Sequence, residues 1–299
     1  MTAVLRAVGD RVAASLRGTL SGSATGVPEW VAALAEPGDA GWSGPGSASW
    51  AVHGSLATLI GGIRALALQA LHPLVLAGVD QHSSYRTDPL SRLWNTNRFI
   101  TITTFGSSAQ AAAEVEMVRA IHRRVVGVAA DGRPYRADDP HLLGWVHLTL
   151  THSMWWAFEH FHDDLDLGAD ADAYFAETAQ VGAALGVTDP ARTAAEASDQ
   201  LDAYLPELTR DDITERTLHF IERPPLSGLT AVGYRPLAAA AWWGLPAAVR
   251  PLAGPGPLVP FPEQAARLEL AGLRAALRRS PAQANAYGRA APEEDEQAG

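Results

Sequence analysis

The chain has 299 residues, of which 47% are hydrophobic and 19% charged, the balance of a globular protein with a sizeable core. Its net charge of −10 excludes an electrostatic fit to nucleic acid phosphates or to an anionic membrane surface. It has no cysteine, which excludes disulfides, thiolate nucleophiles, iron–sulfur clusters and thiolate-ligated haem. Ten histidines remain for metal chemistry.

Targeting and membrane signals are weak. No apolar run reaches the roughly 18–20 residues of a membrane span. The first 20 residues, "MTAVLRAVGDRVAASLRGTL", lack the uninterrupted apolar stretch of a signal peptide. We therefore expect a cytoplasmic protein with no membrane span and no nucleic acid partner.

The N-terminal third alternates loops and helices. Residues 1–47 form an extension with one possible short helix and a loop rich in glycine, proline and serine. From Trp50 the apolar residues repeat at the period of a helix until Pro73, which ends or kinks it. Residues 78–89 are a polar connection. The next stretch, 90–107, is ambiguous because its β-branched run favours a strand locally.

The stretch "QAAAEVEMVRAIHRRVVGV", residues 110–128, predicts an amphipathic helix with Ser107 or Ser108 as N-cap. One histidine interrupts its apolar face, which comprises Val115, Val118, His122, Val125 and Val126. Such a histidine is either a core residue whose N–H finds a carbonyl or a neutral imidazole that ligates a metal. The neighbouring Arg119 and Arg123 are either solvated or paired with anionic groups of a cofactor.

The remainder of the chain predicts helices only. Asp139 and Pro140 have the residue types of N-cap and first position for a helix that is apolar nearly all round and therefore central. Asp170 or Asp172 begins another helix, and Gly186 follows its end. Further helices are expected over 188–205, 211–222 and 229–279. The predicted class is a single all-α domain over 48–280, followed by a disordered acidic tail over 281–299.

Other histidines have structural explanations. His147 and His152 are five residues apart, which does not suit an H-E-x-x-H zinc site, so both are interpreted as core residues. His72 precedes Pro73 and is expected to cap the kink. His82 lies in a polar loop that by itself specifies no chemistry. "EHFHDD", residues 159–164, has metal-ligand types but also reads as a solvated helix end.

Motifs of common enzymes are absent: the chain has no G-x-S-x-G, no P-loop and no G-x-G-x-x-G after a strand. Tryptophans gather near the candidate helices and are expected either to line an apolar pocket or to fill the core: Trp94, Trp145, Trp155 and Trp156.

Several long segments, taken in order, resemble one family. They read "GGIRALALQALHPLVLAGVDQHSSYRTDPLSRLWNT", "FG", "VRAIHRRVVG", "DGRPYRADDPHLLGWVHLTL" and "YFAETAQVGAALGV". They are similar to the catalytic domain shared by the fungal MpaB oxygenase and the bacterial latex clearing protein, a rubber oxygenase, and above all to stand-alone bacterial members. The resemblance covers roughly residues 50–225. It implies an all-helical fold with a globin-like core around a non-covalent haem b, in which 99–105 is helical despite its β propensity.

The resemblance also assigns residues. It implies that His122, in a V-R-x-x-H setting, is the proximal iron ligand. Arg119, Arg123, Arg64 and His72 are assigned to the cofactor site with it. The family's distal R-x-x-K-T appears here as Arg92, Leu93, Trp94, Asn95 and Thr96. Asn95 replaces a lysine that caps the iron in rubber oxygenase, so Arg92, Asn95 and Thr96 are the expected catalytic group. No acid stands in "LHPLVLAGV", where that enzyme has its proposed catalytic carboxylate, so we do not expect polymer cleavage.

The expected function is a haem b oxidoreductase that uses dioxygen or peroxide on a small hydrophobic substrate or natural product. Three alternatives stay open: a haem or hydrophobic-ligand carrier or sensor without turnover, a helical interaction protein that has lost haem, and a non-haem metal hydrolase that uses "EHFHDD". The substrate and the oligomeric state are not predicted.

Overall fold

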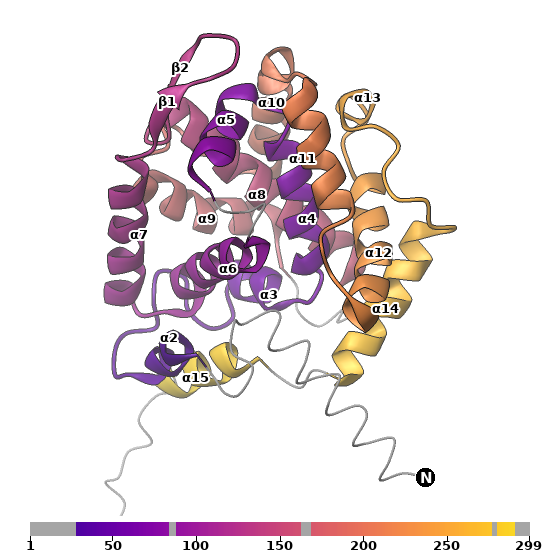
Figure 1. Cartoon of the computed structure of the whole chain (residues 1–299). Coiled ribbons are helices and arrows are strands. Elements are labelled where there is room, and N and C mark those ends of the chain that lie inside the picture. The colour runs from indigo at the N-terminus through magenta and orange to yellow at the C-terminus, as the bar shows by residue number, and fades with distance from the viewer. Residues whose placement is uncertain (1–27, 84–87, 163–168, 277–279, 291–299) are drawn as a thin grey trace, which may run out of the picture.

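The computed structural model describes residues 28–83, 88–162, 169–276 and 280–290, without the side chains of 89–93, 229 and 276 (Figure 1). The described residues are mostly helical, with one short two-stranded hairpin, which confirms the all-α class. Its elements are α2 Glu29–Ala32, η1 Ala33–Ala35, α3 Ala48–Gly54, α4 Thr58–Gln69, α5 Pro73–His82, α6 Pro89–Phe105, α7 Ser108–His122, β1 Val126–Val128, β2 Pro134–Arg136, α8 Pro140–Phe161, α9 Ala171–Leu185, α10 Ala194–Tyr204, η2 Leu205–Glu207, α11 Asp212–Glu222, α12 Gly228–Trp243, α13 Arg250–Ala253, α14 Pro262–Ala276 and α15 Pro281–Ala290.

The centre of the protein is the pair α4 and α8. As predicted, α8 is apolar nearly all round, and Trp145 and Phe161 are fully buried. Its partner α4 also packs against α12, which in turn carries α14 on its outer side (Figure 1). A Cβ at Gly61 would lie 2.9 Å from the carbonyl oxygen of Ser153 on α8. Glycine at this position therefore permits the close approach of the two helices.

The predicted helix ends are confirmed. Ser107 accepts a hydrogen bond from the Gln110 N–H in a complete capping box at the start of α7. Asp139 and Asp170 cap α8 and α9, because their side chains accept hydrogen bonds from backbone N–H groups of the first turn. Gly186 ends α9 with φ of 109°, a left-handed conformation that glycine adopts without strain.

The segment between Trp50 and His82 is more broken than predicted. Two helices, α3 and α4, cross at 90° where one helix was expected. The third, α5, begins at Pro73, and His72 caps it through a hydrogen bond from the Val75 N–H to Nδ1, at 3.4 Å. The ambiguous stretch after it is helical, as the resemblance implied, because α6 runs through 99–105.

The prediction of a helix to residue 128 is wrong. Helix α7 ends at His122, and Val126–Val128 pairs with Pro134–Arg136 in a two-stranded antiparallel hairpin. The physical reason is the sequence after His122, where β-branched valines surround Gly127. A Cβ at Gly127 would lie 2.5 Å from the Tyr135 hydroxyl, so glycine lets the buried Tyr135 cross under the strand. His122 is consequently the last residue of α7 and does not lie in the middle of an apolar helix face.

The expectation of a disordered tail over 281–299 is wrong for its first half, and residues 291–299 lie outside the described residues. Pro281–Ala290 forms α15, which packs on α2, η1 and α6 at the lower edge of Figure 1. Two alanines one turn apart, Ala282 and Ala286, are buried there. The short spacing of small apolar residues gives α15 a face that fits a neighbour although the segment is polar on average.

Hydrogen bonds and ring contacts join the N-terminal extension to α15. The guanidinium of Arg289 donates to the carbonyls of Leu34, Asp39 and Phe105, at 2.5, 3.0 and 2.6 Å. Trp50 packs edge-on against Phe105 and Tyr287.

Within the described residues no single helix combines the length and hydropathy needed to cross a membrane. Only α3 and α4 taken together, with the bend between them, pass that test.

Candidate functional site

His122 lies at the C-terminal end of α7, beside the β1–β2 hairpin. Its ring is partly buried, and its Nδ1 is fully enclosed without a hydrogen-bond partner among the described residues. Burial lowers the pKa of His122, an effect that the charge of nearby Asp138 partly offsets. Leaving a buried polar atom unpaired costs about 1–3 kcal/mol in general. A neutral imidazole with unpaired nitrogen is also the form that ligates a transition metal.

Two arginines of the predicted cofactor site, Arg119 and Arg123, face solvent. Arg119 and Arg123 are exposed and converge on Glu116, with nitrogen–oxygen distances of 3.9 and 2.9 Å. Such exposed pairs contribute little to stability. The structure therefore places both cations on the same helix end as His122, but engaged with a carboxylate.

The predicted distal residues stand on the neighbouring helix α6. Arg98 ties α6 to α7 through a 2.7 Å ion pair with Glu114. The two helices form a hairpin, so residues one turn before Arg98 on α6 lie alongside residues one turn after Glu114 on α7. Asn95 therefore stands toward the His122 end of α7. Asn95 and Thr96 are exposed, and the side chain of Arg92 lies outside the described residues.

Arg64 is not part of this group. It is almost fully buried, at 1% exposure, between α4, α8 and the end of α12. Its Nε donates to the carbonyl of Gly244 at 2.8 Å, and its Nη1 contacts Ser153 Oγ at 2.7 Å and His152 Nδ1 at 3.1 Å. These contacts involve different elements from those that surround His122.

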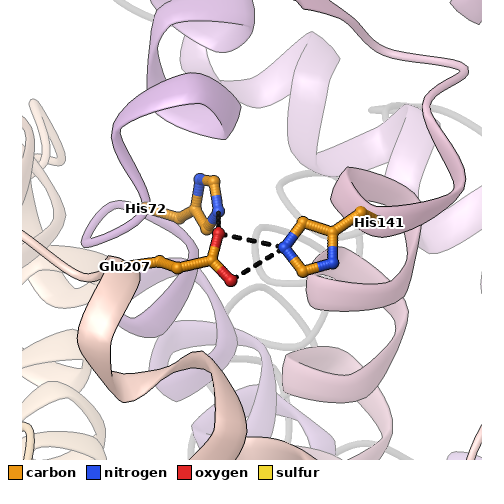
Figure 2. A group of neighbouring side chains, drawn as sticks. All are labelled: His72, His141 and Glu207. Carbon is orange, nitrogen blue, oxygen red and sulfur yellow. Dashed lines mark hydrogen bonds and ion pairs between the residues drawn. The ribbon is translucent and has the colours of Figure 1, made fainter.

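His72 is likewise engaged elsewhere, in a group that was not predicted. Figure 2 shows His72, His141 and Glu207 pointing toward one another from α5, α8 and η2. The Glu207 carboxylate lies 3.3 Å from His72 Nε2 and 2.8 Å from His141 Nε2. No local pattern connects residues 72, 141 and 207, so sequence reasoning had no signal for this group.

Two imidazoles and a carboxylate whose ligand atoms lie within 4.8 Å of one another form a donor set that zinc accepts. The orientation of His72 opposes this use. Its Nδ1 accepts the Val75 N–H as the cap of α5, so the neutral ring carries its proton on Nε2, toward Glu207. A ligating histidine needs that nitrogen bare and normally donates its other N–H. We interpret the group as a hydrogen-bonded connection between η2, α5 and α8.

The remaining candidate histidines lie against neighbouring residues of the fold. His147 packs against Gly182 of α9, where a Cβ would lie 2.8 Å from its Nε2. In "EHFHDD", His160 Nδ1 donates to the Trp156 carbonyl and His162 contacts Ser55, so the two rings diverge. Asp163 and Asp164 lie outside the described residues.

A small cavity of about 40 Å³ was also missed by sequence reasoning. It lies between α3, α6, α8 and α9. His53 contacts Thr104 Oγ1 at 2.7 Å and the Tyr174 hydroxyl at 3.0 Å, and burial lowers the pKa of His53 to about 4. The cavity has room for a water molecule and not for an organic substrate.

The expected core role is seen for a tryptophan of α8, and the pocket that another tryptophan lines is more polar than expected. Trp145 is buried in the core beside Tyr204, whereas Trp156 lines an open pocket together with Trp243. Trp155 packs on Tyr174.

No curated protein and no solved structure matches the chain. A family model does match, over residues 50–279, and its description reads ER-bound oxygenase mpaB/B'/Rubber oxygenase, catalytic domain. The match spans most of the chain and includes both α6 and α7. The chain therefore belongs to the family of mpaB and rubber oxygenase catalytic domains.

Proposed function

We propose that this protein is a haem b-dependent oxygenase that acts on a small hydrophobic molecule, with His122 as the protein ligand of the iron. The family is one of oxygenase catalytic domains, which supports the reaction class. The observation that carries the assignment of His122 is its imidazole, enclosed at the end of α7 with Nδ1 unpaired.

The residues present suit haem. Neither ring nitrogen of His122 is hydrogen-bonded to a described residue, so ligation of a metal would break no existing contact. The chain offers no thiolate, which leaves histidine as the natural ligand for a non-covalent haem. Arg119 and Arg123 would pair with the propionates only by leaving Glu116, an exchange between exposed ion pairs that costs little.

When bound, haem supplies the activation of dioxygen or peroxide. The chain contributes a ligand and a polar environment. Asn95 stands where the resemblance has a lysine, so α6 offers a neutral amide donor without a side chain that competes for the iron. Thr96 adds a hydroxyl on the same helix.

A UV–visible spectrum of the purified protein supplied with haemin tests the proposal. We expect a Soret band and, by pyridine haemochrome, about one haem b per chain. Because Asn95 carries no ammonium, the ferric haem should be high-spin, either five-coordinate or water-ligated. A low-spin spectrum with two nitrogen ligands would contradict the assigned role of α6.

His122→Ala should lose most of the haem, and added imidazole should restore the Soret position. His147→Ala is the matched control, since His147 lies on α8 against Gly182, and it should keep haem. Unchanged haem in His122→Ala together with loss in His147→Ala would overturn the ligand assignment. Consumption of dioxygen or peroxide with candidate substrates then separates an oxygenase from a carrier or sensor that binds haem without turnover.

A further inference from the structure

A pocket of about 430 Å³ opens between α4, α8, α10 and the C-terminal end of α12. It lies on other elements than α6 and α7 (Figure 1). The lining residues that matter are Arg64, His152, Trp156, Asp202, Trp243 and Arg250. Nothing in the proposed oxygenase chemistry uses this pocket.

Arg64 is the unusual residue of the pocket because it is a buried cation without an anion. Its hydrogen bonds go to a carbonyl, a hydroxyl and an imidazole, and none of the ion pairs of the described residues includes it. The centre of the Trp156 ring lies 5.2 Å from the guanidinium, and this cation–π contact offsets the burial of the charge only weakly. Burial lowers the pKa of Arg64 to about 9, so it stays charged at neutral pH. A buried charge without a counter-ion is costly.

Arg64 and His152 each have one N–H donor that is not hydrogen-bonded to a described residue and is not fully enclosed. Arg64 Nη2 has no hydrogen bond to a described residue, yet it is not among the enclosed unpaired atoms. His152 accepts from Arg64 at Nδ1, so its proton is on Nε2, which also faces open space. The free edge of a buried guanidinium is a donor that a carboxylate oxygen accepts well.

The apolar surface that this pocket offers to a ligand is the exposed ring of Trp243, because Trp156 is stacked on His160 with ring centroids 4.6 Å apart. The rings of Trp156 and Trp243 are 5.9 Å apart and tilted by 55°. Trp156 packs directly against Gly244, and a Cβ at that position would collide with the indole ring. Arg250 is an exposed second cation on the lining, and its Nε and Nη2 donate to the carbonyls of Leu245 and Trp243. Asp202 is the one acid on the lining, and it is exposed and makes no ion pair with Arg64.

We propose that this pocket binds a small organic carboxylate with a planar apolar body. The carboxylate takes the free edge of Arg64, and the apolar body lies against Trp243. The site is independent of haem and of His122.

Isothermal titration calorimetry with 2-naphthoate tests the proposal, and 2-naphthamide is the neutral control of the same shape. We expect the wild-type protein to bind naphthoate with a dissociation constant below about 1 mM and at least tenfold more tightly than the amide, a difference of about 1.4 kcal/mol. Arg64→Met should lose this preference. Arg235→Met makes the same change at an exposed arginine of α12 outside the lining and should retain it.

If Arg64→Met does not fold, His152→Phe provides the test, because it keeps a ring and removes the Nδ1 acceptor that orients Arg64. It should weaken naphthoate binding about three- to tenfold and leave the amide unchanged. No naphthoate binding by the wild type, equal binding of acid and amide, or unchanged binding by the folded Arg64→Met variant would overturn the proposal. Inorganic phosphate that binds more tightly than naphthoate would also overturn it, in favour of a phosphate site.

Discussion

The close contact between α4 and α8 gives a pair of neighbouring substitutions with opposite expected effects. In a helix interior alanine is more stable than glycine by about 0.5–1 kcal/mol. At Gly62 the nearest atom to an added Cβ is the end of Met154, 4.0 Å away, so Gly62→Ala should gain this amount. At Gly61 the added Cβ would meet the Ser153 carbonyl oxygen at 2.9 Å and Met154 Cα at 3.0 Å. These atoms belong to the backbone of α8 and cannot rotate away.

Overpacking of a core costs about 1–3 kcal/mol, and a backbone contact belongs to the upper part of that range. We therefore expect Gly61→Ala to be less stable than the wild type by about 1–2 kcal/mol after the helix propensity is included. In a protein of this size that lowers the melting temperature by roughly 2–8 °C. The stability of both variants is measured from urea midpoints and from thermal melts followed by circular dichroism. Stabilisation by both alanines would refute the contact.

Three further predictions follow from single contacts. His122→Phe removes an unpaired nitrogen, so the haem-free chain should be as stable as the wild type or about 1 kcal/mol more stable; a clear loss would mean that His122 is structural. Asp170→Ala removes the cap that accepts the Ala173 N–H at 2.9 Å and should cost about 1 kcal/mol in the urea midpoint; an unchanged midpoint would show that the cap is not formed. The hydrogen bond from the Ser108 N–H lowers the pKa of Asp39, so its stabilisation is present above the unfolded pKa and is lost as pH falls through the folded one. The stability deficit of Asp39→Asn should accordingly shrink between about pH 7 and pH 2, and a deficit independent of pH would contradict it.

Features set by neighbouring residues were predictable from the sequence. Helix caps such as Ser107 and Asp139 satisfy donors two or three positions away, so their residue types reveal them. The left-handed Gly186 is of the same kind. The fold class follows from the helical period, which recurs along most of the chain.

Features made by distant residues were not predictable. The contact of His72 with Glu207 joins residues 135 positions apart, and that of Arg64 with Gly244 joins residues 180 apart. The bend between α3 and α4 depends on what each helix packs against, and propensity does not report it. The helix α15 was misjudged because its composition is polar while its packing partners lie near the N-terminus. The assignment of His122 as iron ligand stays a prediction.

The hydrogen bonds from Arg289 to three carbonyls constrain the order in which parts of the protein fold during synthesis. Its partners Leu34 and Asp39 precede it by 255 and 250 positions, and translation proceeds from the N-terminus. The central helices can therefore pack on the ribosome while Trp50 still lacks Tyr287, the ring that lies 5.0 Å from it. This end of the protein can assemble only after residues 287–289 have been synthesised, and until then its aromatic face is open to chaperones.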